Sequence, residues 1–322
     1  MTRRRRPSKF RSGARAIAPV AVAIAVAGGL AALPRVAAAQ SCCVGTGLLT
    51  PARLRTFEDH ALGMQMRARS VMGAFRSGGG YASSVSGNRD LGFEESLFGA
   101  VRFGSHFQVG LSAPFLQTSR QVAGASGFGG GLGDVAATAR FDAVNAGEHG
   151  HWPGVAIIAG LSVPTGRPPD EADPSDPLAA SATGSGSFEG NLGVALEEII
   201  GNGFVSMASW ISQRSARAAG GVGQSFAPRV TALVSGGYTF GHDATVGAFA
   251  SLLRQGDAHE ASGAVIANSG VALVTTGAAL ALPFWQWWRL QTTLFTDVPI
   301  AGWGRNQTVG FGGTLAFIRV WI

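Results

Sequence analysis

From about residue 60 to the last residue, apolar and polar positions alternate along the chain with a period of two. One stretch shows it clearly: Asp134, Thr138 and Arg140 fall on one face, while Val135 and Phe141 fall on the other. This period is typical of β-strands, in which successive side chains point to opposite faces. Because no stretch shows the period of an amphipathic helix, the sequence predicts an all-β fold.

Twelve such stretches follow one another, and Gly, Ser and other turn-forming residues separate them. They cover residues 61–75, 92–104, 107–120, 132–144, 153–165, 187–200, 203–215, 227–241, 243–255, 268–283, 287–298 and 307–322. An even number of consecutive strands is typical of an up-and-down meander that closes into a barrel.

Two all-β architectures fit this alternation. In a soluble sandwich the apolar face meets a second sheet, whereas in an outer-membrane barrel it meets lipid and the polar face lines the lumen. The connections decide between them, because those after even strands are mostly short, with 145–152 the exception. The connections after odd strands are mostly longer: 76–91, 121–131, 166–186, 216–226, 256–267 and 299–306. We therefore predict a transmembrane antiparallel β-barrel of about twelve strands, with short periplasmic turns and long extracellular loops.

The first 39 residues differ from the rest in charge. They hold eight of the 25 Lys and Arg residues and no acid, which leaves 17 cations against 19 acids for the remainder. A basic start, an apolar stretch over 17–33 and the small residues 37–39 predict a secretory signal peptide cleaved after Ala39. An uncleaved anchor helix is the weaker alternative. The pI of about 10.5 therefore describes the leader, and no nucleic-acid partner is expected.

These features predict three parts: a signal peptide over 1–39, a short periplasmic N-terminal segment over 40–60, and an outer-membrane barrel over 61–322. The expected location is the outer membrane of a Gram-negative-type bacterium, with membrane lipids and the outer-membrane assembly machinery as partners. The last strand runs to the end of the chain and carries Trp321 as its penultimate residue, which is similar to the assembly signal of barrel proteins. Lipid modification of Cys42 is a minority alternative.

Charged residues of both signs fall on the polar face. The predicted lumen-lining residues are Arg67, Arg69, Glu94, Arg102, Asp134, Arg140, Asp142, Glu189, Glu197, Arg229, Arg289 and Asp297. They can form arginine–carboxylate pairs that hold the barrel closed, or a constriction that selects solutes by size and charge. The sequence leaves both interpretations open.

Most of the tryptophans fall beside the predicted periplasmic turns. The predicted membrane-interface aromatics are Trp152, Trp285, Trp287, Trp288 and Trp321. Indole rings prefer the headgroup layer, because their apolar body and their N–H group need different surroundings. Arg319 shares the expected lipid-facing register of Phe317 and is tolerable there only near an interface.

Three short motifs occur in order: Gly-Leu-Gly-Asp at 131–134, Val-Pro-Thr-Gly-Arg at 163–167 and Thr-Gly-Ser-Gly-Ser-Phe at 183–188. In this pattern residues 60–322 resemble the bacterial family of outer-membrane barrel proteins associated with the meta-pathway of phenol degradation. The resemblance implies a barrel that admits small, including aromatic, compounds. It implies no catalytic residue.

The function that these features indicate is a channel for passive passage of small solutes. A closed structural or loop-binding barrel is the alternative, and a barrel hydrolase using His259 is a weaker one. The His149/His151 pair with Glu148 and the acidic loop 166–186 are more typical of solvated loops than of metal sites. We expect no enzyme activity, no metal and no cofactor.

Overall fold

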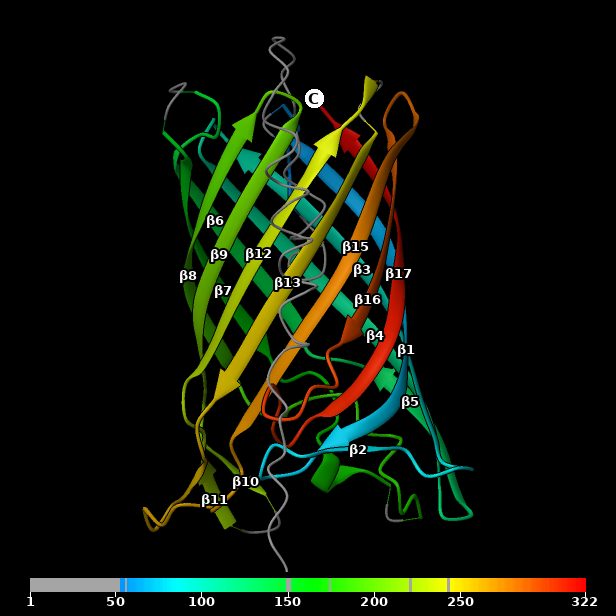
Figure 1. Cartoon of the computed structure of the whole chain (residues 1–322). Coiled ribbons are helices and arrows are strands. Elements are labelled where there is room, and N and C mark those ends of the chain that lie inside the picture. Colours follow the sequence, from blue (N-terminus) through cyan, green and yellow to red (C-terminus); the bar gives the residue numbers. More distant parts are fainter. Residues whose placement is uncertain (1–52, 56, 149–151, 174, 220–221, 242–243) are drawn as a thin grey trace, which may run out of the picture. The chain divides into compact units, whose positions relative to one another are not determined.

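Twelve long antiparallel strands pair in chain order into one closed sheet (Figure 1). Their bounds are β1 (His60–Phe75), β3 (Arg89–Phe103), β4 (Phe107–Val122), β6 (Val135–Val144), β7 (Gly154–Val163), β8 (Glu189–Ile200), β9 (Gly203–Arg214), β12 (Arg229–Thr239), β13 (Thr245–Gln255), β15 (Val271–Trp285), β16 (Trp288–Asp297) and β17 (Thr308–Trp321). The predicted all-β meander of twelve strands is confirmed.

The computed structural model describes residues 53–55, 57–148, 152–173, 175–219, 222–241 and 244–322. All of them belong to one compact unit, Ala37–Ile322. The predicted signal peptide, Cys42 and the His149/His151 pair lie outside the described residues. Within the described part of the chain, no helix is long and apolar enough to cross a membrane.

Pairing between the first and last strands closes the barrel. The register runs from His60 opposite Trp321 to Ala74 opposite Thr308, with one irregularity after Val71. We call the end where β1 begins and β17 finishes the turn end, because short connections such as 104–106, 201–202 and 286–287 lie there. The opposite end is the loop end; in Figure 1 it is at the bottom.

Short extra elements lie in the connections of the loop end. They are β2 (Tyr81–Ser83), β5 (Ala125–Leu132), η1 (Pro169–Glu171), β10 (Arg217–Ala219), β11 (Val222–Ser225) and β14 (His259–Glu260). The prediction of 121–131 as a loop is wrong, because β5 pairs with β4 from Phe115 opposite Leu132 to Val122 opposite Ala125. Glycines at 127, 129, 130 and 131 hid this strand, since glycine is depleted in strands.

The barrel wall is apolar outside and polar inside. On β1, Met64 and Met66 are more than 40% exposed, while Gln65 between them is 8% exposed. On β16, Leu294 is exposed while Thr293 is buried. A soluble protein turns its apolar side chains inward, so this polarity is the reverse of a soluble fold and is typical of a wall surrounded by lipid.

Several phenylalanines nevertheless point inward, and each lies against a glycine of a neighbouring strand. Phe98 pairs with Gly63, Phe204 with Gly237 and Phe249 with Gly277, and Phe295 lies against Gly312. A methyl group on Gly277 would lie 2.6 Å from the Phe249 ring and 2.4 Å from the Leu294 carbonyl oxygen. The glycines thus make room for the rings to lie along the wall.

The variant Gly277→Ala tests this arrangement. Its methyl group would clash with a ring and with backbone, so we expect a loss of about 1–3 kcal/mol in the free energy of unfolding, measured by urea titration of the protein refolded in lipid vesicles. Gly190→Ala on β8 is the control, because a Cβ there meets nothing within 4 Å. Equal stabilities of the two variants would contradict the proposed role of the glycine.

Candidate functional site

The inward charges near the loop end form compact ion pairs. Arg69 donates to Asp297 at 2.9 Å, and the same carboxylate accepts from the Thr275 hydroxyl at 2.6 Å and the Gly310 N–H at 3.0 Å. Asp297 is only 3% exposed. Because its oxygens accept three hydrogen bonds, this buried carboxylate is well compensated.

Three further ion pairs lie on the inner wall, one beside this carboxylate and two on strands across the barrel. Arg67 lies 3.8 Å from Glu94 and also places its guanidinium 4.9 Å from the centre of the Phe295 ring. Glu189 on β8 receives Arg214 at 2.8 Å and is also paired with Arg229. The sequence predicts which residues lie on the polar face, and the structure shows which of these form ion pairs with one another.

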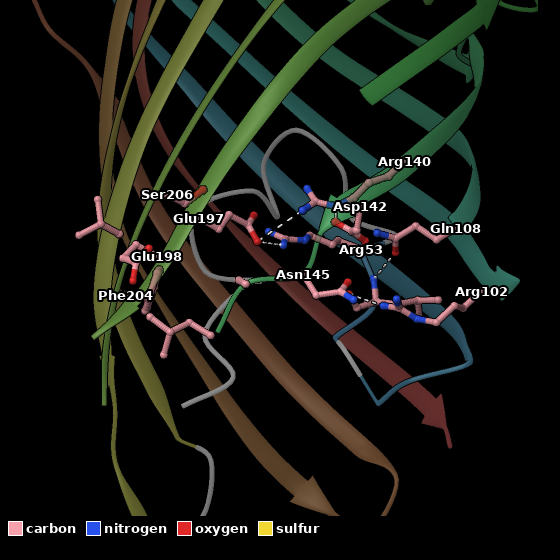
Figure 2. Close-up of a pocket in the computed structure, with 14 residues that line it drawn as sticks. Arg53, Arg102, Gln108, Arg140, Asp142, Asn145, Glu197, Glu198, Phe204 and Ser206 are labelled. Atoms are coloured by element: carbon pink, nitrogen blue, oxygen red, sulfur yellow. Dashed lines mark hydrogen bonds and ion pairs between the residues drawn. The ribbon is translucent and has the colours of Figure 1, made fainter. Parts of the chain in front are cut away.

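A second group of charges gathers at the turn end, on strands that lie far apart in the chain. Arg140 of β6 donates to Asp142 at 2.7 Å and lies 3.4 Å from Glu197 of β8. Glu197 is also paired with Arg53, which precedes the barrel (Figure 2). We call Arg53, Arg140, Asp142 and Glu197 the turn-end cluster.

The described residues of 53–58, here called the crossing segment, lie among these inward side chains. The Leu54 N–H donates to the Gln108 side chain of β4 at 3.1 Å, and Arg289 of β16 donates to Glu58 at 2.8 Å. Strands β16 and β8 lie on opposite sides of the closed sheet. The segment therefore runs across the lumen at the turn end.

The Arg102 side chain binds the backbone of the crossing segment. Its guanidinium donates to the carbonyl oxygens of Glu58 at 3.1 Å and Arg55 at 2.9 Å. Leu54 is 2% exposed and packs with the inward Phe98 and Ile318. One apolar side chain and several charge-assisted hydrogen bonds thus fix the segment.

A small cavity remains between the crossing segment and the barrel wall. It measures about 40 Å³ and is lined in part by Asn145 and Ser206 beside the turn-end cluster (Figure 2). That volume has room for about three water molecules. The contact is therefore polar and hydratable, unlike a close-packed apolar core.

The sequence did not indicate the role of this segment. Arg53, Leu54 and Glu58 precede the first alternating stretch and fell within the predicted periplasmic segment 40–60. The only local signal in the sequence is a leucine between two charged residues shortly before a strand. The residues that bind this segment lie far along the chain. By contrast, most ion-pair partners on the barrel wall were among the predicted lumen-lining residues; the exceptions are Asp90, Arg120 and Arg214.

The three glycine-rich motifs meet at the loop end, where β5 gives way to β6. The Asp134 carboxylate accepts hydrogen bonds from the backbone N–H groups of Gly166 at 3.0 Å and Ser185 at 2.7 Å. A side chain on Gly184 would place its Cβ 2.5 Å from that carboxylate. Asp134 thus ties both ends of the loop 166–186 to the barrel, and glycine is required for the close approach.

Two threonines complete this arrangement, which we call the loop clamp. The Thr165 hydroxyl donates to the Gly133 carbonyl oxygen at 2.6 Å. The Thr183 hydroxyl donates to the Leu132 carbonyl oxygen at 2.7 Å and accepts from the Arg167 N–H at 3.0 Å. Asp134, which the sequence predicts as a lumen-lining residue, therefore holds the loop through backbone hydrogen bonds.

Three of the four acidic side chains of the clamped loop have partners within the protein. Asp170 pairs with Arg217 at 2.9 Å, and Asp176 accepts from two backbone N–H groups of its own loop. Hydrogen bonds from the Ser175 side chain and backbone lower the pKa of the exposed Asp173 carboxyl. Among the described residues, no group of three or more His, Cys, Asp or Glu side chains is placed to hold a metal ion.

A cavity of about 450 Å³ opens between this loop and the inner wall of β3 and β4. Arg120 on β4 lies at its edge, 3.4 Å from Asp90, and donates to the Leu178 carbonyl oxygen at 2.7 Å. The other lining residues are Glu94, Pro114, Leu116, Asp134, Pro169, Ala179, Ala182, Thr183, Gly184 and Ser185. The clamped loop thus shapes the loop end of the lumen.

The predicted interface aromatics all lie at or beside the turn end. Trp285 closes β15 opposite Trp288 of β16, with Trp287 between them, and Trp321 closes β17. Trp152 lies just before β7 and is 72% exposed. Their contact with a membrane interface stays a prediction.

The arrangement that a hydrolase would need is not formed around His259. Asp257, the nearest acid before it, pairs with Arg305 at 3.2 Å, and Glu260 accepts a hydrogen bond from Ser262. Among the hydrogen bonds of the described residues, none joins either carboxylate to the His259 imidazole. The expectation that the chain is not an enzyme stays a prediction.

The variant Asp134→Ala tests the loop clamp. Each hydrogen bond to a charged group contributes about 1.5–3 kcal/mol to stability, so we expect the loop to open in this variant. Endoproteinase Glu-C should then cut after Glu171 faster, as measured by mass spectrometry of the digest. Asp173→Ala is the control in the same loop, because within the described part of the chain its carboxylate accepts hydrogen bonds from Ser175 alone. Unchanged cleavage of Asp134→Ala would contradict the clamp.

No protein-family model matches the sequence, and no curated protein matches it. Among solved structures, the fold is similar to the COG4313 outer membrane channel from Pseudomonas putida F1, with a TM-score of 0.67, 15% identity, and coverage of 82% of this chain and 96% of that one. The translocator domain of the autotransporter NalP from Neisseria meningitidis has a TM-score of 0.46 and 11% identity, covering 81% and 88%. A TodX monoaromatic hydrocarbon channel mutant also has a TM-score of 0.46, with 9% identity and coverage of 86% of this chain and 94% of that one. The first of these structures shows that the fold is that of an outer-membrane β-barrel.

Proposed function

We propose that this chain is an outer-membrane channel of a Gram-negative-type bacterium through which small solutes pass passively. The reversed polarity of the wall carries the proposal: exposed Leu, Met and Phe side chains surround a lumen lined by charged and hydroxyl groups. A barrel of this polarity is stable in lipid and offers a hydrated path across it. The similar Pseudomonas protein is described as an outer membrane channel.

The proposal includes the route to the membrane. Residues 1–39 act as a signal peptide that is removed on export, and β17 with its penultimate Trp321 is read by the outer-membrane assembly machinery. The turn end then faces the periplasm and the loop end faces outward. Short turns at one end and long loops at the other support this orientation.

For the solute class, we propose small compounds with both apolar and polar surface, aromatic compounds among them. The inner wall supports this, because Trp210 packs beside the inward Leu233, Phe249 and Phe295. Arg67 lies against the Phe295 ring. Phe249 and Phe295 are themselves buried, so the partly exposed Trp210 and the Arg67 guanidinium are the groups that a solute would meet on this wall. The resemblance to the phenol-pathway family also implies passage of small aromatic compounds.

The crossing segment is the barrier in this proposal. It lies across the lumen at the turn end, and its contacts are mainly ion pairs and hydrogen bonds that water can replace. The same geometry favours the second candidate, a permanently closed barrel that acts through its loops. The two differ in whether the segment leaves its place.

Conductance in planar lipid bilayers distinguishes them. Glu197→Gln removes the charge that Arg53 and Arg140 share, so we expect more frequent and larger openings than in the unaltered protein. The matched control is Glu189→Gln, on the same strand and also between two arginines, but far from the crossing segment. We expect its conductance to stay close to that of the unaltered protein.

Each other outcome is informative. If the folded protein and both variants show neither conductance nor flux of small aromatic solutes, the barrel is closed and the channel proposal fails. If Glu189→Gln opens the barrel as much as Glu197→Gln, the crossing segment is not the barrier. Refolding is checked in each case by the shift in gel mobility on heating.

A further inference from the structure

One arginine lies on the outer, apolar face of the barrel at the turn end. Arg319 of β17 is exposed and shares its face with Phe317, which is 40% exposed. Its neighbours in the sheet are Leu62 of β1 and Trp288 of β16. A guanidinium is thus placed in surroundings that are otherwise apolar or aromatic.

Two indole rings hold this guanidinium. Its central carbon lies 5.8 Å from the Trp288 ring centre and 5.1 Å from the Trp321 ring centre. Stacking on indole faces attracts a cation and fixes the plane of the guanidinium. It leaves the N–H groups at the rim of the plane free to bind an acceptor.

None of the ion pairs found among the described residues includes Arg319. The inward Arg53, Arg69, Arg140 and Arg289 are each paired with a carboxylate. Arg319 is therefore an oriented, uncompensated cation.

We propose that Arg319, Trp288 and Trp321 form a binding site for the phosphate of a phospholipid headgroup. The planar guanidinium matches the oxygen geometry of a phosphate. The exposed side chains of Leu62, Met64 and Phe317 continue from Arg319 toward the middle of the barrel wall and would contact the acyl chains. The site rests on the proposed placement in a membrane and is independent of solute passage.

Native mass spectrometry of the refolded barrel in a phosphate-free maltoside detergent tests the site, with added phosphatidylglycerol as the probe. We expect Arg319→Gln to weaken retention of the lipid about tenfold, which corresponds to about 1.4 kcal/mol. Arg319→Lys keeps the charge but lacks the planar guanidinium, so its lipid retention should lie between that of the unaltered protein and that of Arg319→Gln. Phosphatidylglycerol with brominated chains should quench tryptophan emission in the unaltered protein more than in Arg319→Gln.

The matched control is Arg254→Gln. Arg254 is also exposed, on the same face of β13 as Leu252, but lies at the loop end. It should retain the lipid like the unaltered protein. If Arg319→Gln and Arg254→Gln behave alike, or if inorganic phosphate displaces the lipid completely, the site is not a lipid site.

Two further outcomes are covered by the design. If Arg319→Gln does not refold, Arg319→Lys and a Trp288→Leu variant provide the same comparison, and unchanged lipid retention in both would overturn the proposal. Bilayer conductance is recorded in parallel. If the unaltered protein conducts but does not retain the lipid, the lipid site fails and the channel proposal stands. If it retains the lipid but does not conduct, the channel proposal fails and the lipid site stands.

Discussion

The pairing of β1 with β17 is the constraint on which the rest of the structure depends. A sheet in lipid cannot leave an edge, because no water is present to satisfy its backbone N–H and C=O groups. The register from His60 to Ala74 removes that edge. Once the sheet is closed, every second side chain must face a restricted interior. The ion pairs, the clamped loop and the crossing segment are all consequences of filling that interior with polar groups.

Glycine lets the inner face of the wall hold aromatic side chains. Gly63, Gly237 and Gly277 each accept a flat ring from the neighbouring strand, where any larger residue would collide with it. The 48 glycines of the sequence are thus more than turn residues, and the wall uses them as recesses.

The sequence predicts the strands well because one physical signal, alternation, covers nearly all of them. It fails where another demand interrupts the alternation. Strand β6 begins at Val135 and not at 132, because Gly133 and Asp134 serve the loop clamp. An inward ring such as Phe98 has the parity of the polar positions, but its residue type is the one expected on the lipid face, so position and residue type gave conflicting signals. The crossing segment has no period at all, and its place depends on partners distant in the chain.

The sequence separation between these partners bears on the order in which their contacts form during folding. Arg53 and Glu197 are separated by 144 positions, and Glu58 and Arg289 by 231. Contacts of such sequence separation form late, since the intervening chain must first be placed. The contact of the crossing segment with Arg289 therefore forms only when β16 has joined the wall. The contact of Leu54 with Gln108 spans only 54 positions and can form earlier, so the segment is attached to β4 before it is attached to β16.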